Sequence, residues 1–300
     1  MSIPETYPIS EFLNYLTFQK RYSKYTIISY RTDLTAFFDF IFLEYQTTDL
    51  LEISIPMVRS WLATLKEKKM ASKTINRKIS SLKSFFKYQL RLNNIAASPL
   101  ATTSSLKVSR KLPSFIEEKG IQKLFNETSF PPDWEGKLNY LIFEIFYETG
   151  IRLSELINLK EAQVDKSSGT IKVLGKGNKE RLIPVSNHLL NHIDEYISEK
   201  RKQLPESAHT FLLVNKKGKI LYPKYVYNMV RKYLAQVSTI QRKSPHVMRH
   251  SFATHLSNNG AQINAIKELL GHSSLAATQI YTHNTIERLK EVYKLAHPLS

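Results

Sequence analysis

Apolar residues recur at helical spacing in four successive segments of the N-terminal third, and this pattern constrains the fold more than any other feature of the chain. Ser10 is placed to cap the first helix, Ser23 or Thr26 to open the second, and Ser72 to open the fourth. Pro56 suits the first turn of the third helix. Four amphipathic helices of this length form a small bundle.

The stretch after the fourth helix is rich in Ala, Ser and Thr and runs into Lys107, Arg110 and Lys111. Such a composition is typical of a linker, here a basic one. We therefore expect three parts: a helical N-terminal domain at residues 1–100, a basic linker at 101–113 and a C-terminal domain at 114–300.

The C-terminal part mixes helical patterns with short strand patterns. Two strands flank the turn Gly175-Lys176-Gly177-Asn178, which favours an antiparallel hairpin. We expect helices over 117–126, 137–149, 153–159, 188–201, 223–235, 245–258, 261–270 and 285–296, and strands over 170–174, 181–185 and 210–214. The expected fold class is mainly α: a four-helix bundle followed by a mixed α+β domain with a small antiparallel sheet.

Positive charge is concentrated in two long windows that contain no Asp or Glu. Residues 68–116 hold eleven Lys or Arg, and residues 207–267 hold ten. At the chain's average frequency, these windows together would contain roughly ten carboxylates. The whole chain has a formal charge of +17. A polyanion is the expected partner, nucleic acid before an acidic membrane surface.

The chain contains no cysteine. Disulfide frameworks, thiolate zinc sites, iron–sulfur clusters and a cysteine nucleophile are therefore excluded. The N-terminal residues lack the basic and apolar regions of a signal peptide, and no apolar run approaches the length of a membrane span. We expect a cytoplasmic protein with no membrane partner.

Four motifs follow one another in the C-terminal part. They are Thr149-Gly150-Ile151-Arg152-Leu153-Ser154-Glu155-Leu156, the turn Gly175-Lys176-Gly177, Pro245-His246-Val247-Met248-Arg249-His250, and Leu270-Gly271-His272 with Tyr281 nine residues later. Their order and spacing resemble the tyrosine recombinases (the phage integrase family), and the length with a helical first domain resembles the Xer branch. The resemblance covers nearly the whole chain.

The resemblance implies a DNA strand exchanger with an N-terminal SAM-like bundle that binds core DNA and a C-terminal catalytic domain. Tyr281 would attack the scissile phosphodiester and leave a 3′-phosphotyrosyl bond with a free 5′-hydroxyl. Glu155 would orient the site through hydrogen bonds. The implied catalytic set is Arg152, Lys176, His246, Arg249, His272 and Tyr281. No cofactor, metal or ATP is implied, and no histidine spacing resembles a zinc motif.

The residue types suit this chemistry. Phosphoryl transfer needs positive charge at the non-bridging oxygens, an acid for the leaving oxygen and an aligned nucleophile. Arg152 and Arg249 are permanent cations, and His246 lies three residues before Arg249, so the two share a helix face. Lys176 stands between two glycines at a hairpin tip. Without the resemblance, a surface arginine, a solvated hairpin lysine and a helix-capping histidine remain open alternatives.

Among the sixteen tyrosines, only the spacing to His272 selects Tyr281 as the nucleophile. Tyr293 is the nearest rival, but its place in an amphipathic helix favours packing. His250 and His255 match no catalytic motif, and we expect them to pack between helices.

The resemblance also implies partners. A clamp of two domains would hold a double-stranded DNA recombination site, and a homo-tetramer, or a hetero-tetramer with a sister recombinase, would join two sites. The C-terminal helix would dock on the neighbouring subunit, and a DNA translocase of the division septum would be a further partner. The expected role is resolution of chromosome dimers at cell division, since the chain has no room for the arm-binding domain of phage integrases. A mobile-element integrase and a non-catalytic architectural protein are the alternatives.

Overall fold

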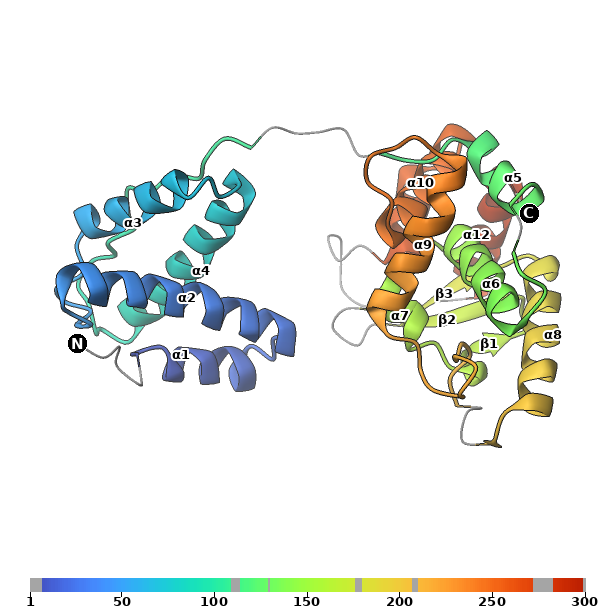
Figure 1. The fold of residues 1–300 in the computed structure, drawn as a ribbon, viewed down its shortest axis with the longest axis horizontal. Coiled ribbons are helices and arrows are strands. Elements are labelled where there is room, and N and C mark those ends of the chain that lie inside the picture. Colours follow the sequence, from blue (N-terminus) through green and yellow to red (C-terminus); the bar gives the residue numbers. More distant parts are fainter. Residues whose placement is uncertain are drawn as a thin grey trace. The chain divides into compact units, whose positions relative to one another are not determined.

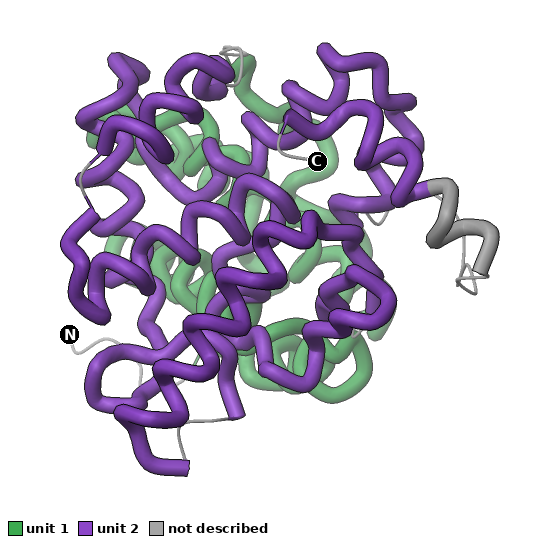
Figure 2. Tube along the Cα trace, turned by 90° about the vertical axis from the view of Figure 1, so that its right-hand side faces the viewer, with its two compact units in different colours: residues 1–111 green, residues 112–300 purple. Residues whose placement is uncertain are grey.

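The computed structural model describes residues 7–108, 114–128, 130–175, 180–206, 210–271 and 283–298, with the backbone alone for 283–288. The chain divides into two compact units, Met1–Lys111 and Leu112–Ser300 (Figures 1 and 2). Each unit has its own hydrophobic core. Over the described residues, no helix is both long and apolar enough to cross a membrane.

Unit 1 is helical in every described element. The elements are α1 Ser10–Asn14, a π-helical turn η1 Tyr15–Gln19, α2 Lys24–Tyr45, α3 Ile55–Glu67 and α4 Ser72–Arg91. The hydroxyl of Ser23 caps α2 by accepting a hydrogen bond from Thr26 N at 3.3 Å, as expected. The expected cap at Ser10 is wrong, because Ile9 already has α-helical backbone angles and Ser10 lies inside the helix.

The core of unit 1 is strongly aromatic. Phe37 and Phe38 of α2 are fully buried and pack edge-to-face with Phe86 and Phe85 of α4, respectively. Edge-to-face pairs add about 0.5–1.5 kcal/mol beyond the burial of apolar area. These contacts join the two longest helices of the unit.

The polar stretch after α4 begins as part of unit 1. Leu100 is buried in the core, and Leu106 packs against it. Asn76 of α4 binds both backbone groups of Leu106, accepting from its N–H at 2.7 Å and donating to its carbonyl at 2.9 Å. The chain is therefore held on unit 1 as far as residue 106.

Unit 2 combines helices with one small sheet (Figure 1). Its elements are α5 Glu118–Asn126, α6 Trp134–Thr149, α7 Leu153–Ile157, a 3-10 turn η2 Glu161–Gln163, β1 Val164–Asp165, β2 Thr170–Leu174, β3 Glu180–Pro184, α8 Asn187–Gln203, α9 Pro223–Val237, α10 Pro245–Asn258, α11 Ile263–Leu270 and α12 His283–Ala296. The mainly α class with a small antiparallel sheet is confirmed.

The helix α6 is the centre of unit 2. It is buried along most of its length and packs against α8 and α10. The sheet has the order β1-β2-β3 and is antiparallel throughout, with Ile171 opposite Ile183 in the hairpin. The helices α11 and α12 both pack against β3. The end of α6, the hairpin and α11 are thereby brought together.

The third strand does not lie where the sequence pattern predicted it. Residues 211 and 214 form only isolated bridges, and the third strand is β1. Side chains of α8 occupy the backbone groups that a strand would use: Tyr196 Oη donates to Val214 O at 3.1 Å, and Lys200 Nζ donates to Leu212 O at 3.1 Å. The apolar pattern of this stretch therefore reflects burial and not a ladder.

Candidate active site

Three arginines converge on the carboxyl end of α11. Its last carbonyl groups each accept a hydrogen bond from a different guanidinium: Leu269 from Arg181 Nε at 2.8 Å, Leu270 from Arg249 Nη2 at 2.6 Å, and Gly271 from Arg152 Nη2 at 3.2 Å. Because a helix carries partial negative charge at this end, it attracts cations. The end of α11 is thereby joined to three other parts of unit 2: Arg152 comes just before α7, Arg181 from β3 and Arg249 from α10.

Arg152 stands at the N-cap of α7, three residues after Thr149, the last residue of α6. Glu155, three residues on, accepts from the Arg152 backbone N–H at 2.9 Å and from Nη1 at 2.8 Å. The Arg152 side chain still keeps 30% of its surface exposed. It is thus fixed at one edge and open to a ligand at the other.

Arg249 lies on α10 and is buried. Besides its bond to α11, Nη1 donates to the carbonyl of Gly150 at 2.6 Å. Burial, followed by repulsion from Arg152 and Arg181, lowers the pKa of Arg249 to about 9, so it remains charged at neutral pH. Among the described residues, no carboxylate lies within ion-pair distance of it.

Gly150 allows this close approach. It ends α6 in the left-handed conformation, with φ +56°, and a Cβ there would lie 2.5 Å from Phe252 Cδ1 of α10. A side chain would push α10 away and carry Arg249 with it. The glycine of the first motif therefore has a packing role as well as a backbone one.

Arg181 belongs to none of the four sequence motifs and was not expected at the site. This side chain is buried beside Ile183 on the inner face of β3, and its Nη2 donates to Glu155 Oε2 at 2.9 Å. Burial alone would raise the pKa of Glu155, but hydrogen bonds and charge from Arg181 and Arg152 outweigh it and lower the pKa. Glu155 is therefore ionised and orients two arginines. The signal in the sequence was an arginine on the same face of the predicted strand as the apolar residues Ile183 and Val185.

The site holds more positive than negative charge. Three guanidiniums surround one described carboxylate, Glu155, which leaves a formal charge of +2. Within the described residues, the hydrogen bonds of Arg249 go to carbonyl groups. Preorganised cations of this kind stabilise an anion whose charge grows in a transition state, as in phosphoryl transfer.

His246 lies in the first turn of α10, with an exposed side chain, three residues before Arg249. Ser244 occupies the N-cap position, but its hydroxyl makes no capping hydrogen bond. The first N–H groups of α10 are thus not capped by that side chain, and such groups favour anions. The structure brings Arg152, His246 and Arg249 into the same part of unit 2.

The other three expected catalytic residues, Lys176, His272 and Tyr281, lie outside the described residues. Their neighbours are placed. Lys176 falls in the connection between β2 and β3, and His272 follows Gly271, whose carbonyl binds Arg152.

Tyr293 and His255, two of the three residues expected to pack between helices, are buried in unit 2. Tyr293 of α12 is buried, and its hydroxyl donates to Glu148 Oε2 at 2.9 Å, which raises its pKa further above the level that burial sets. His255 is buried between Tyr147 and Ile116, with ring nitrogens 2.9 Å from the hydroxyl of one and the carbonyl of the other. Burial lowers the pKa of the half-buried His250.

Family models match both units. The model described as "Phage integrase family" matches residues 114–288, and "Phage integrase, N-terminal SAM-like domain" matches residues 9–93. A protein named tyrosine recombinase XerC from Anoxybacillus flavithermus is 37% identical over 295 residues, covering 97% of this chain and 98% of that protein. The XerC of Halalkalibacterium halodurans is 37% identical over 304 residues, covering 99% of each.

Solved structures share the fold at lower identity. The XerH site-specific recombinase, crystallised with a palindromic difH substrate as a post-cleavage complex, is 23% identical with a TM-score of 0.72, covering 96% of this chain and 83% of that chain. The Tn1549 transposon integrase in complex with circular intermediate DNA is 19% identical with a TM-score of 0.69, covering 94% and 99%.

Proposed function

The chain belongs to the phage integrase family and is a site-specific tyrosine recombinase of the Xer type, and from that premise we propose how its residues cleave and rejoin DNA. The observation that carries the proposal is the uncompensated charge around α11. Arg152 and Arg249 bind the non-bridging oxygens of the scissile phosphate and stabilise the charge that develops on them.

Tyr281 is the nucleophile. Its phenol oxygen forms a bond to phosphorus as the bond to the 5′-oxygen breaks, which gives a 3′-phosphotyrosyl ester and a free 5′-hydroxyl. In the second step, a 5′-hydroxyl from the partner strand attacks the ester and restores both a phosphodiester and the tyrosine. Because the ester keeps the energy of the broken bond, the exchange needs no ATP.

Lys176 is the acid that protonates the leaving 5′-oxygen. Its position between Gly175 and Gly177 allows the tip of the hairpin to carry it to the DNA. His246 and His272 donate hydrogen bonds to the phosphate and help to align the nucleophile. Arg181 and Glu155 are positioning residues, since they hold Arg152 and the end of α11 without reaching the substrate.

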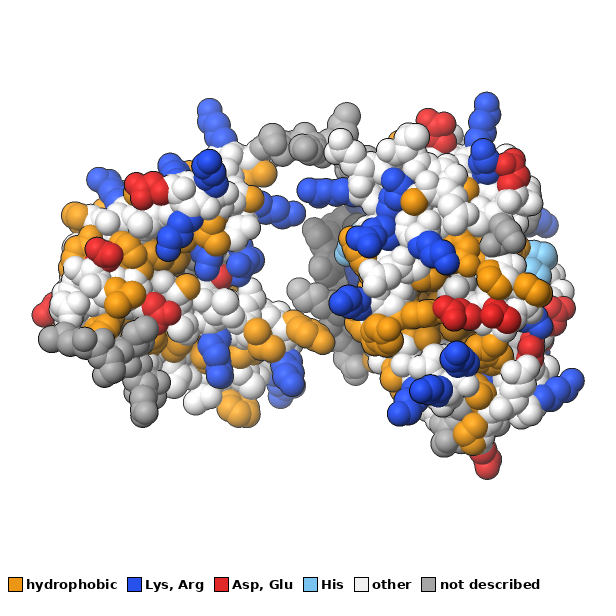
Figure 3. Space-filling model, in the orientation of Figure 1, with side chains coloured by type: hydrophobic (Ala, Val, Ile, Leu, Met, Phe, Trp, Pro, Cys, Tyr) orange, Lys and Arg blue, Asp and Glu red, His pale blue; other side chains and the backbone are white. Residues whose placement is uncertain are grey.

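Double-stranded DNA is the partner, and both units bind it. On unit 1, the exposed face of α4 carries Lys73, Lys87 and Arg91, and the helix contains no Asp or Glu. Figure 3 shows Lys and Arg side chains spread over the drawn faces of both units. Contacts with backbone phosphates set position on DNA and make binding depend strongly on salt.

The biological role proposed is resolution of chromosome dimers in the cytoplasm. A tetramer, either of this chain or with a sister recombinase, would act on two sites, with a septal DNA translocase as activator. The relatives named XerC favour this role over that of a mobile-element integrase, although the transposon integrase has the same fold. A non-catalytic architectural protein would be expected to have lost at least one of the six catalytic residue types, and all six are present.

The test is covalent trapping on nicked suicide DNA followed by a denaturing gel. The intact chain should give a protein–DNA band, and Tyr281→Phe should give none while binding DNA within a few-fold of the intact chain. Tyr293→Phe is the matched control and should still give the band, because that hydroxyl is buried against Glu148. A band with Tyr281→Phe would refute the proposed nucleophile.

The role of Lys176 has its own test. A 5′-bridging sulfur leaves as a thiolate and needs no proton, so it should restore cleavage by Lys176→Ala. Arg152→Ala should stay slow on the same substrate, since the non-bridging oxygens are unchanged. Equal rescue of both variants would move the acid to His246 or His272.

A further inference from the structure

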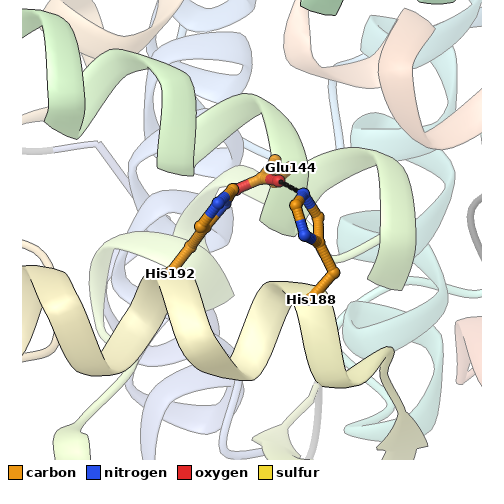
Figure 4. A group of neighbouring side chains, drawn as sticks. All are labelled: Glu144, His188 and His192. Carbon is orange, nitrogen blue, oxygen red and sulfur yellow. Dashed lines mark hydrogen bonds and ion pairs between the residues drawn. The ribbon is translucent and has the colours of Figure 1, made fainter.

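A cluster of metal-ligand side chains lies in unit 2 apart from the proposed catalytic residues. Glu144 projects from α6 toward His188 and His192 of α8 (Figure 4). His192 Nδ1 is 2.7 Å from Glu144 Oε2, and His188 Nε2 is 3.6 Å from Glu144 Oε1. None of these residues belongs to the four recombinase motifs.

The geometry suits a single ion. The two histidines are four residues apart, so they stand one above the other on the same face of α8, and their ring centroids are 4.2 Å apart. One ligand atom from each of the three side chains lies within 4.8 Å of the others. Zinc takes imidazole nitrogen and carboxylate oxygen at about 2.0–2.2 Å, and a set of three protein ligands leaves a fourth position for water.

The side chains can close around an ion with small movements. Glu144 is fixed by burial, with 2% of its side chain exposed, whereas His188 is 64% exposed and open to solvent. His192 is intermediate at 30% and packs edge-on against Tyr140. The site therefore has a buried anchor and an entry from solvent.

The local charge also favours a cation. Glu144 and Glu148 are both buried on α6, one turn apart, and the ion pairs of Glu144 within the described chain are with the two histidines. Glu148 accepts from Ser186 and Tyr293 and has no cation within ion-pair distance in the described structure. A divalent ion would supply the missing positive charge.

We propose that Glu144, His188 and His192 bind one divalent transition-metal ion of the zinc class, with water as the fourth ligand. The ion cross-links α6 to α8 and has no part in strand cleavage. Ser186, the N-cap of α8, and Tyr293 of α12 share the carboxylate of Glu148 one turn along α6. By holding α6 against α8, the ion also stabilises the contact that Tyr293 of α12 makes with Glu148.

The sequence could not reveal this site. Two histidines at helical spacing match no zinc motif alone, and the carboxylate lies 48 positions before His192. Only the packing of α6 against α8 brings the three ligands together.

The experiment uses the full chain and Co²⁺, whose visible absorption reports coordination, with Zn²⁺ as competitor. We expect one Co²⁺ bound per chain with the intense bands of a four-coordinate site, displaced by one equivalent of Zn²⁺. His188→Asn, His192→Asn and Glu144→Gln should each weaken binding at least about tenfold. His250→Asn, which removes a histidine elsewhere on the unit, should bind as the intact chain does.

Thermal melting provides the second readout. Zn²⁺ should raise the midpoint of the intact chain in proportion to the logarithm of its concentration, and should raise it much less in the three ligand variants. The Zn²⁺-free melts show which variants still fold. Binding equal in the intact chain and all three variants would overturn the proposal, as would the absence of any Co²⁺ binding. Either result would leave a hydrogen-bonded histidine–carboxylate cluster in its place.

Discussion

Each unit buries a carboxylate among cations, but the two clusters use their charge differently. In unit 1, the Asp33 cluster joins α2 to α4: Asp33 pairs with Arg77, lies 3.1 Å from Lys78 Nζ, and accepts from Ser81 Oγ at 2.9 Å. In unit 2, the Glu155 cluster consists of Arg152, Glu155, Arg181 and Arg249. There, one arginine pairs with no described carboxylate, and all three also donate to the end of α11.

The difference separates a structural cluster from a functional one. Both cations of the Asp33 cluster are directed at its one carboxylate, which leaves a formal charge of +1 there against +2 in the Glu155 cluster. In the Glu155 cluster, the bonds of Arg249 within the described structure are to carbonyl groups, which leave its guanidinium charge intact. A buried arrangement with charge to spare costs stability and is retained where an anion must bind.

The largest stability effect is expected for Asp33→Ala. It leaves the buried Lys78 without its carboxylate and should lower the free energy of unfolding of unit 1 by about 3–5 kcal/mol. Trp61 lies in unit 1 and Trp134 in unit 2, so denaturant titration of a Trp134→Phe chain reports unit 1 alone. Glu44→Ala, on the exposed face of α2, is the control and should cost less than about 0.5 kcal/mol. Similar midpoints for the two variants would remove the structural role of the Asp33 cluster.

Arg181→Met should have the next largest effect, this time in unit 2. Glu155 keeps Arg152 but loses its buried partner, so we expect a loss of about 3 kcal/mol, at the low end for a broken buried pair. The signal is Trp134 fluorescence in a Trp61→Phe chain. Lys172→Met on β2 removes only an exposed ion pair and should cost at most about 1 kcal/mol. If both variants unfold alike, Arg181 does not hold the cluster.

Some residues of the Glu155 cluster could be predicted from the sequence and others could not. Arg152 and Arg249 stand in motifs, and local chemistry supports them. Arg181 belongs to no motif, and its role depends on the register that turns it inward beside Ile183. The helices could be predicted from the helical spacing of apolar residues and from capping residues such as Ser23. The strand predicted at 210–214 is wrong because side chains of α8, which the sequence pattern cannot place beside it, bind its backbone.

Acid should distinguish the units as well. All nine histidines lie in unit 2, where burial lowers the pKa of His297 to about 4. A histidine with a depressed folded pKa contributes stability above its unfolded value of about 6.5, and this stability is lost as the pH falls toward 4. Between these pH values, the free energy of unfolding of unit 2 should fall by about 3 kcal/mol less in His297→Gln than in the intact chain.

Trp134 fluorescence at each pH checks this expectation. Protonation of Glu144 is common to both chains and cancels in the difference. Unit 1, followed by Trp61, contains no histidine and should show no such difference between the chains. Parallel curves for the two chains in unit 2 would contradict the assignment to His297.

The smallest effects concern two helix ends. Gln46 ends α2 and Gly150 ends α6, both in the left-handed conformation, at φ 57° and 56°. Gln46→Gly should relieve strain and stabilise unit 1 by about 1 kcal/mol. Gly150→Ala should destabilise unit 2 by more than about 1 kcal/mol, since its Cβ would also meet Phe252 at 2.5 Å. If Gln46→Gly and Gly150→Ala shifted the denaturant midpoints of their units by the same amount in the same direction, the left-handed conformation would not be what determines stability at these helix ends.

The spare charge of the Glu155 cluster is tested most directly by removing the charge it should neutralise. On ordinary DNA, Arg249→Ala and Arg152→Ala should each slow single-turnover cleavage by about 10²–10³. On DNA whose scissile phosphate carries a neutral methyl group in place of one non-bridging oxygen, the same variants should fall within about tenfold of the intact chain. Arg77→Ala, in the Asp33 cluster, should cleave as the intact chain does on both substrates. An equal penalty on charged and neutral substrates for the two arginines of unit 2 would contradict the account.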